Sequence, residues 1–579
     1  MGIGGRFGIP RFTPTHSAPQ WTKAGGVGGG VGGEVGVRRG GAEICASTWR
    51  SSPSRCASPS LCGIGQQRKA LAGLAFSLMM IVALAAGADD KAAPSTSELP
   101  ARVETQHTVN LPGHPLDYRA VAETIGLTDH KGDPTASVYT VSYLVDAPAG
   151  PPRPVAFVFN GGPGAASVFL HLGGLGPRIL ETPASGAVPS PPVHLVDNPS
   201  TWLVFTDLVF VDPVGTGFSH GKGKEENPDK PFWSVHGDLN SLGAVVRRWL
   251  TRHERWSAPV FLVGESYGGL RAAALADSLE REVGVTVSGL VLISPALDIA
   301  ILHPDISNTL APAFQLPSYA AVAAALSEAA SPAEVGRSAE GLAMSAERFA
   351  MTDYLVGLAG LKGIPDAGDP FIARLSALVG LPVEIVRRQR GRIPNRIFAR
   401  ELRRAQGEIL SLYDATVTRA AGANPSDDNA GDPVLGPAIA AYTAAFDSYA
   451  PEGLGYRTER PYRVLPHDVS RQWNWDGVRG PDGGGEGGLG LALSSLEKTL
   501  LAHPGTKLLI ANGRYDLVTP YLASRWLVDQ LALPTAVRAA IRLRVYEGGH
   551  MMYMRPKSRA ALAADAADIF APQSAAPAR

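Results

Sequence analysis

Short apolar segments of strand length alternate with helix-like segments over two parts of the chain. The first part holds apolar segments at 154–159, 208–211, 259–263 and 289–294, with helix-like segments at about 238–253 and 270–276. The second part holds strand-like segments at 507–510 and 541–546, followed by a helix-like segment near 558–570. The alternation therefore predicts an α/β fold, with a mostly parallel central sheet covered by helices on both faces.

The pattern changes near residue 300. From residue 301 to about 460 the chain is rich in alanine and helix-like, with breaks at Pro317, Pro332, Pro365 and Pro394. The strand pattern resumes only at Lys507. We therefore expect residues 301–495 to form a helical cap inserted into a core made of residues 89–300 and 496–579.

The N-terminal residues are unlike the rest of the chain. Residues 1–66 contain 16 glycines and no helical or strand periodicity, which indicates disorder or sequence that is absent from the mature protein. Residues 67–88 begin with Arg68 and Lys69, continue with an apolar run from Leu71 to Ala86, and end in small residues. This arrangement predicts a signal peptide cleaved after Ala88, although a retained N-terminal anchor is the alternative. An incorrectly assigned start site would explain the residues ahead of the signal.

Charge balance and cysteine content limit the binding partners and the chemistry that we expect of the folded part. The chain has 53 basic and 53 acidic residues, but residues 89–579 keep only 44 basic against 51 acidic ones. Nothing in this balance indicates a nucleic acid or an anionic membrane surface as partner. The three cysteines all lie within residues 1–66, so we expect neither disulfides nor a thiol nucleophile in the folded part.

A candidate nucleophile lies between the strand 259–263 and the helix that follows it. The segment Gly264-Glu265-Ser266-Tyr267-Gly268 has the Gly-x-Ser-x-Gly pattern of a nucleophile elbow, in which a sharp turn exposes a serine hydroxyl. Glycines two residues before and after the serine let the strand and the helix pass close together. A glycine-rich turn without chemistry would show a similar pentapeptide, so its partners decide between the two interpretations.

A serine nucleophile needs a histidine base and a carboxylate that orients the histidine. In folds of this kind the acid and the histidine follow the serine in the chain, each in a loop after a late strand. Asp516 follows the strand at 507–510, and His550 follows the strand at 541–546. We assign Asp516 as the acid and His550 as the base, with Asp298 as the alternative acid.

The oxyanion of the tetrahedral intermediate needs preorganised N–H donors. We expect one from the backbone of Tyr267, the residue after the serine. The second is expected from the loop Asn160-Gly161-Gly162-Pro163-Gly164, most plausibly from Gly162.

The sequence contains no HExxH motif, no CxxC pair with zinc spacing and no phosphate-binding P-loop. We therefore expect neither a metal ion nor a cofactor.

Several motifs together resemble those of the serine carboxypeptidase family, of the cathepsin A and carboxypeptidase Y type. They are Asn160-Gly161-Gly162-Pro163-Gly164, Leu175-Gly176-Pro177, Asp197-Asn198-Pro199 with Trp202, Asp212-Pro213-Val214-Gly215-Thr216-Gly217-Phe218-Ser219, the elbow 264–268, and Gly549-His550-Met551. The resemblance covers roughly residues 150–300 and 505–560 and implies an α/β-hydrolase fold. The cap resembles that of the bacterial branch of this family.

The resemblance also implies an activity, the removal of one C-terminal residue from a peptide. It implies that Asn160 and Glu265 help to bind the terminal carboxylate of the substrate, and we expect Met551 at the floor of the pocket. The chain departs from the family pattern at two positions. Ala165 replaces a cysteine, and Gly174 replaces a second carboxylate-binding glutamate, which leaves the expected carboxylate site incomplete.

The leading prediction is an exported, periplasmic or secreted serine carboxypeptidase that acts on peptides with a free C-terminus through an acyl-enzyme. An esterase or acyltransferase on the same scaffold is the first alternative, and an inactive binding protein is the second. We expect no stable membrane insertion after signal cleavage. The sequence leaves the oligomeric state open, a homodimer included.

Overall fold

The computed structural model describes residues 99–146, 150–303, 305–326, 338–360, 370–422, 431–475 and 490–572. The predictions for residues 1–66 and for the signal peptide at 67–88 concern residues outside these ranges. Within the described ranges, no helix is both long and apolar enough to cross a bilayer.

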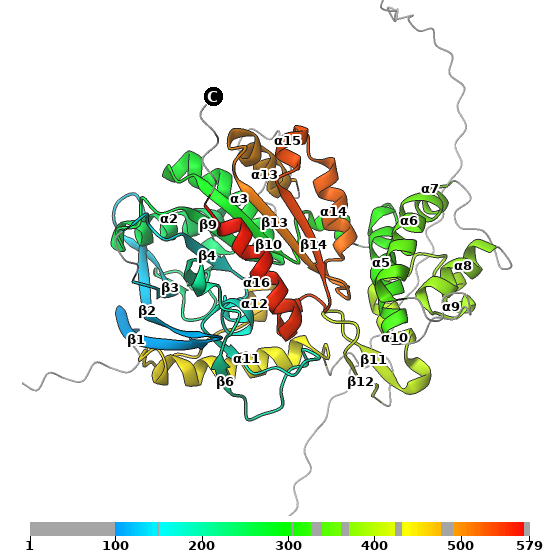
Figure 1. Cartoon of the computed structure of the whole chain (residues 1–579), viewed down its shortest axis with the longest axis horizontal. Coiled ribbons are helices and arrows are strands. Elements are labelled where there is room, and N and C mark those ends of the chain that lie inside the picture. Colours follow the sequence, from blue (N-terminus) through cyan, green and yellow to red (C-terminus); the bar gives the residue numbers. More distant parts are fainter. Residues whose placement is uncertain are drawn as a thin grey trace, which may run out of the picture. The chain divides into compact units, whose positions relative to one another are not determined.

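Within the described residues, one sheet of ten strands forms the centre of the fold (Figure 1). The strand order is β1-β2-β3-β7-β4-β9-β10-β13-β14, and β8 pairs with β3. The bounds are β1 Arg102–Leu111, β2 His114–Thr128, β3 Pro134–Leu144, β4 Val155–Phe159, β7 Asp207–Val211, β8 His220–Gly221, β9 Val260–Glu265, β10 Val287–Ile293, β13 Lys507–Gly513 and β14 Ile541–Tyr546.

The sheet is antiparallel on one side and parallel over the rest. The pairs β1–β2, β2–β3 and β3–β7 are antiparallel, whereas β7, β4, β9, β10, β13 and β14 form a parallel series. In β4, β7 and β9 every residue is buried. The uninterrupted apolar runs of these strands are therefore explained by helices on both faces.

Alternate side chains of the central strand β9 pack into two separate hydrophobic cores, one on each face of the sheet. Phe261 and Val263 of β9 pack into the core that contains α11 and α16, whereas Val260 and Leu262 pack into the core under α2, α3 and α13. Helix α16 crosses the sheet in front in Figure 1. The sheet covered on both faces confirms the predicted α/β fold.

The helices on and around the sheet have the following bounds: α1 Val168–Leu170, α2 Val235–Arg252, α3 Tyr267–Ser278, α11 Leu435–Glu452, α12 His467–Gln472, α13 Leu491–Ala502, α14 Tyr521–Gln530, α15 Thr535–Arg538 and α16 Pro556–Phe570. Two short antiparallel pairs lie outside the main sheet: β5 Arg178–Leu180 with β6 Leu195–Asp197, and β11 Glu408–Leu410 with β12 Thr418–Ala420.

The region after β10 is mainly helical. Its helices are α4 Ile299–Leu302, α5 Leu310–Ala325, α6 Ala339–Phe349, α7 Leu355–Ala359, α8 Pro370–Val379, α9 Val383–Arg388 and α10 Asn395–Glu401. Residues of α5, α6, α8, α9 and α10 share a third core, and in Figure 1 these helices form a group apart from those on the sheet. Below, residues 301–422 are called the cap segment. In contrast, α11 packs in the core of the sheet.

Candidate active site

Ser266 lies at the turn between β9 and α3. It caps α3 with φ +60° and ψ −125°, a backbone conformation that L-residues rarely adopt. A Cβ on Gly264 would overlap the carbonyl oxygen of Gly268, and a Cβ on Gly268 would lie 2.7 Å from the carbonyl oxygen of Phe159. Side chains at either position would therefore push strand and helix apart, so the two glycines permit the strained turn that presents Ser266.

Asp516 lies in the loop that follows β13 and is completely buried. Its Oδ1 accepts hydrogen bonds from the backbone N–H groups of Val518 (2.7 Å) and Thr519 (2.9 Å). Its Oδ2 accepts a bond from the Thr519 hydroxyl (2.7 Å) and lies 2.8 Å from Nδ1 of His550. These bonds fix the carboxylate in one orientation toward the histidine.

His550 follows β14, and its side chain is almost completely buried. Because an ionised carboxylate can only accept, Nδ1 of His550 carries the proton in the bond to Asp516, and Nε2 is left as the basic nitrogen. Burial lowers the pKa of His550. The charge and hydrogen bond of Asp516, helped by Glu265, outweigh burial and raise that pKa above its usual value.

Ser266 and His550 line the same cavity. Its remaining walls are formed by Asn160, Gly161, Gly162, Ala165, Phe169, Glu265, Tyr413, Leu435, Leu465, Val518 and Met551. Within the part of the chain that the structure describes, the Ser266 hydroxyl and the His550 ring are not directly hydrogen-bonded. Catalytic hydrogen bonds are often long in unliganded enzymes and tighten when substrate binds.

The loop after β4 lies directly against the elbow. A Cβ on Gly161 would lie 2.6 Å from the backbone nitrogen of Tyr267, so this glycine permits the close approach of the two segments. Gly162 has φ +99° and also lines the cavity. The two expected oxyanion donors, Gly162 and Tyr267, thus belong to adjacent segments beside Ser266.

A buried ion pair links the helix after the elbow to its neighbouring segments. Nε of Arg271 donates to Oδ2 of Asp238 at 2.7 Å, and both side chains are almost fully buried. Arg271 also donates through Nη1 to the carbonyl oxygen of Asn160. Arg271, on α3, therefore joins the elbow helix to α2 and to the loop after β4.

Glu265 is a buried carboxyl group at the edge of this cavity. Its Oε2 accepts a 2.8 Å bond from the Tyr553 hydroxyl and a second bond from Nδ2 of Asn160. Oε1 forms no hydrogen bond within the described residues. Burial raises the pKa of Glu265 to about 7, against the lowering effects of His550, Tyr553 and Asn160. Near neutral pH this group therefore exchanges a proton, with Oε1 as its free oxygen.

Asn160 has both ends of its side-chain amide occupied. Nδ2 donates to Glu265, and Oδ1 accepts from the backbone N–H of Leu170 at 3.0 Å. Asn160 therefore orients Glu265 and caps the turn at Leu170, which leaves Glu265 as the polar group with a free oxygen.

The space beside Gly174 is filled by an aromatic ring. Gly174 lies in the π-helical turn His171–Leu175, and a Cβ on it would lie 3.1 Å from Cγ and Cδ2 of Tyr553. A glutamate at this position would displace the ring that donates to Glu265. Tyr553 thus occupies the place where the sequence analysis noted a missing carboxylate.

The two candidate acids, Asp516 and Asp298, have different hydrogen-bond partners in the structure. Asp298 is half-buried and caps α4 by accepting a 2.9 Å bond from the backbone N–H of Ala300. Among the described residues, the carboxylate bonded to His550 belongs to Asp516 and not to Asp298.

Sequence reasoning missed Tyr413, Thr519, Tyr553 and the pair Asp238–Arg271. Tyr413 lies in the cap segment, and its ring meets the His550 ring edge-on, with centroids 5.2 Å apart. Tyr553 follows His550 by three residues, so its proximity to the site was a usable signal. Nothing in the local pattern around Tyr413 indicates that it reaches the site.

The topology and the site together define a class of protein. A mostly parallel sheet, a strained serine elbow and an aspartate–histidine pair in the loops after two later strands are the features of an α/β-hydrolase. Residues 134–300 match the model of the serine carboxypeptidase family. This match confirms the resemblance to the serine carboxypeptidase family that the motifs predicted.

Curated relatives match the same region. Serine carboxypeptidase-like 5 of Arabidopsis thaliana is 29% identical over 157 residues, which are 26% of this chain and 34% of the relative. Serine carboxypeptidase-like 13 of the same plant is 27% identical over 199 residues, covering 32% of this chain and 42% of the relative. The chain thus spans less than half the length of these relatives. They are plant proteins and give no support to the expected bacterial branch.

Solved structures show only remote similarity. A proline iminopeptidase of Mycobacterium smegmatis is 14% identical with a TM-score of 0.28, over 80% of this chain and 97% of that chain. A lipase in its open form is 13% identical with a TM-score of 0.30, over 78% of this chain and 98% of that chain. The fold assignment depends instead on the strand order and on the elbow.

Proposed function

We propose that the chain is a serine carboxypeptidase that removes the C-terminal residue of a peptide through an acyl-enzyme. The observation that carries this proposal is the buried carboxyl of Glu265, which lines one cavity together with Ser266 and His550. A protonated carboxyl can donate through Oε1 to the terminal carboxylate of a peptide. An esterase would have no need for such a group.

In the proposed reaction Ser266 Oγ attacks the carbonyl carbon of the last peptide bond while Nε2 of His550 removes the hydroxyl proton. Asp516 holds the imidazolium that forms. The N–H groups of Gly162 and Tyr267 stabilise the oxyanion. His550 then returns the proton to the leaving amine, the C–N bond breaks, and the C-terminal residue departs. Water, deprotonated by His550, cleaves the acyl-enzyme and restores the serine.

The walls of the cavity support an apolar substrate. Ala165, Phe169, Leu435, Leu465, Val518 and Met551 line it, and among the described lining residues there is no lysine or arginine. A substrate carboxylate would therefore meet the Glu265 carboxyl instead of a cation. We infer that substrates have uncharged side chains next to the scissile bond. We also propose that the enzyme is exported, on the pattern of residues 67–88.

The reaction type is tested with three substrates that share one blocked apolar dipeptide: the free acid, the C-terminal amide and an aryl ester. We expect the free acid to be cleaved with a higher kcat/KM than the amide, because only the acid has the carboxylate that Glu265 binds. Mass spectrometry identifies the released residue. Equal or faster cleavage of the amide would reject the carboxypeptidase in favour of an esterase or a general amidase.

The pH dependence gives a second test of Glu265. Because its raised pKa of about 7 keeps Glu265 protonated at lower pH, kcat/KM for the free acid should fall as pH rises through about 7. Glu265→Gln should remove this fall. The Gln carbonyl would accept from Tyr553 and Asn160, so its amide NH₂ would take the place of Oε1 and donate at every pH.

The amide substrate is the matched control, since it carries no carboxylate and its kcat/KM should lack the fall near pH 7. An unchanged alkaline limb for the free acid in Glu265→Gln would show that Glu265 does not bind the carboxylate.

A further inference from the structure

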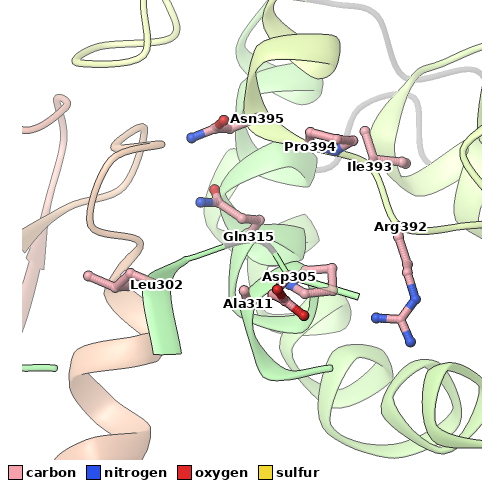
Figure 2. Close-up of a pocket in the computed structure, with 9 residues that line it drawn as sticks. Leu302, Asp305, Ala311, Gln315, Arg392, Ile393, Pro394 and Asn395 are labelled. Atoms are coloured by element: carbon pink, nitrogen blue, oxygen red, sulfur yellow. The ribbon is translucent and has the colours of Figure 1, made fainter. Parts of the chain in front are cut away.

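The carbonyl oxygen of Leu517, the residue after Asp516, is held by two side chains of the cap segment. Nε2 of Gln315 donates to it at 3.1 Å, and Nδ2 of Asn395 donates to it at 2.9 Å. Gln315 lies on α5 and Asn395 is the first residue of α10. Figure 2 shows their amide groups directed to the same side of a small pocket in the cap segment. A carbonyl oxygen has two lone pairs, so these two donors saturate it.

The backbone on both sides of Asp516 is bonded to the cap segment as well. The N–H of Leu517 donates to the carbonyl of Leu412 at 3.0 Å, and the N–H of Ala415 donates to the carbonyl of Tyr515 at 3.1 Å. Leu517 is completely buried and belongs to the core of the cap segment. The acid loop is therefore attached to the cap through its main chain.

The same stretch of the cap segment also reaches the loop of the base. The N–H of His550 donates to the carbonyl of Tyr413 at 2.5 Å, and the ring of Tyr413 meets the His550 ring. Residues 412–415 thus join the loop of Asp516 to the loop of His550. The loops of the acid and of the base are therefore attached to the same stretch of the cap segment.

We propose that Gln315 and Asn395 are positioning residues, which hold Asp516 against His550 by anchoring the carbonyl of Leu517. This inference rests on the proposed function, because it assigns the Asp516–His550 pair to catalysis. The backbone bonds from Val518 and Thr519 to Asp516 shape the turn internally. The amides of Gln315 and Asn395 are external side-chain anchors of the turn, in addition to its main-chain bonds to residues 412–415 and the bond from the Thr519 hydroxyl to the carbonyl of Ser294.

The two donors are redundant, which makes the test specific. Gln315→Leu and Asn395→Leu each leave one donor on the carbonyl of Leu517, whereas the double variant leaves none. We expect each single variant to lose only a few-fold in kcat. The double variant should lose about 10- to 100-fold, more than the product of the single losses, because a misplaced catalytic group is costly. Ser318→Ala, on the same helix and without a hydrogen bond for its buried hydroxyl, is the control.

A second readout does not need turnover. In the double variant the pKa of His550, followed by NMR, should fall relative to the wild type, because Asp516 raises it. Fluorophosphonate titration corrects kcat for the fraction of folded sites. If the double variant does not fold, the double variant Gln315→Glu with Asn395→Asp gives the same test, since carboxylate oxygens then replace both donor nitrogens.

An unchanged His550 pKa and an unchanged kcat per titrated site in the double variant would overturn the positioning role. A wild-type protein without peptidase activity would instead reject the proposed function. In that case the His550 pKa still decides whether the two amides position Asp516.

Discussion

Replacing Ser266 with alanine should lower kcat for peptide hydrolysis by roughly 10⁶-fold, because nucleophile, base and acid act as one unit. The substitution removes the nucleophilic hydroxyl, whereas the backbone donors at Gly162 and Tyr267 remain. Residual activity should therefore be limited to what those donors and substrate binding provide. The measurement is kcat on a blocked apolar dipeptide with a free C-terminus.

The matched control is Ser278→Ala, a buried serine at the last residue of the same helix α3. It should keep wild-type kcat, since Ser278 does not line the cavity. If Ser266→Ala retained more than a small fraction of wild-type turnover in a preparation free of other peptidases, Ser266 could not be the nucleophile.

Replacing Asp516 with asparagine should lower kcat by about 10⁴-fold, the second largest expected effect. The amide would present a donor to Nδ1 of His550, so the imidazole would adopt the tautomer with the proton on Nε2 and could not act as a base. The loss of a negative charge should also lower the pKa of His550, because Asp516 raises it. Kinetics over a range of pH measures both effects.

Asp298→Asn is the control, because it tests the alternative acid with the same change of chemistry. Asparagine caps helices about as well as aspartate, so α4 should stay intact and kcat should remain within about twofold of wild type. A large loss in Asp298→Asn together with a small loss in Asp516→Asn would reverse the assignment of the acid.

The fold could be predicted from the sequence because strand-like and helix-like segments alternate along the chain, which indicated a mostly parallel sheet. The structure explains runs such as Val260–Val263 by the burial of every residue of this central strand. The surface against which each helix packs could not be predicted from the sequence. Helix α11 belongs to the alanine-rich region, yet it packs in the core of the sheet, because a pattern of apolar positions does not specify which surface covers it.

The site was accessible where a residue follows a strand. Asp516 and His550 were identified from their loops after β13 and β14, and the structure joins them by a 2.8 Å contact. The roles of Tyr413 and Gln315 could not be predicted, since both come from the cap segment and only tertiary packing brings Tyr413 to His550 and Gln315 to Leu517. Tyr553 fills the space beside Gly174, and only the coordinates show that the missing side chain is replaced by a ring from another segment.

The central claim is that Ser266 is a nucleophile activated by His550. The most direct measurement is the rate of labelling by a fluorophosphonate, with the adduct located by mass spectrometry of the digested protein. We predict a single adduct on Ser266 in the wild type, and labelling that is slowed by orders of magnitude in His550→Ala. An adduct on another residue, no adduct at all, or equal labelling of wild type and His550→Ala would contradict the claim.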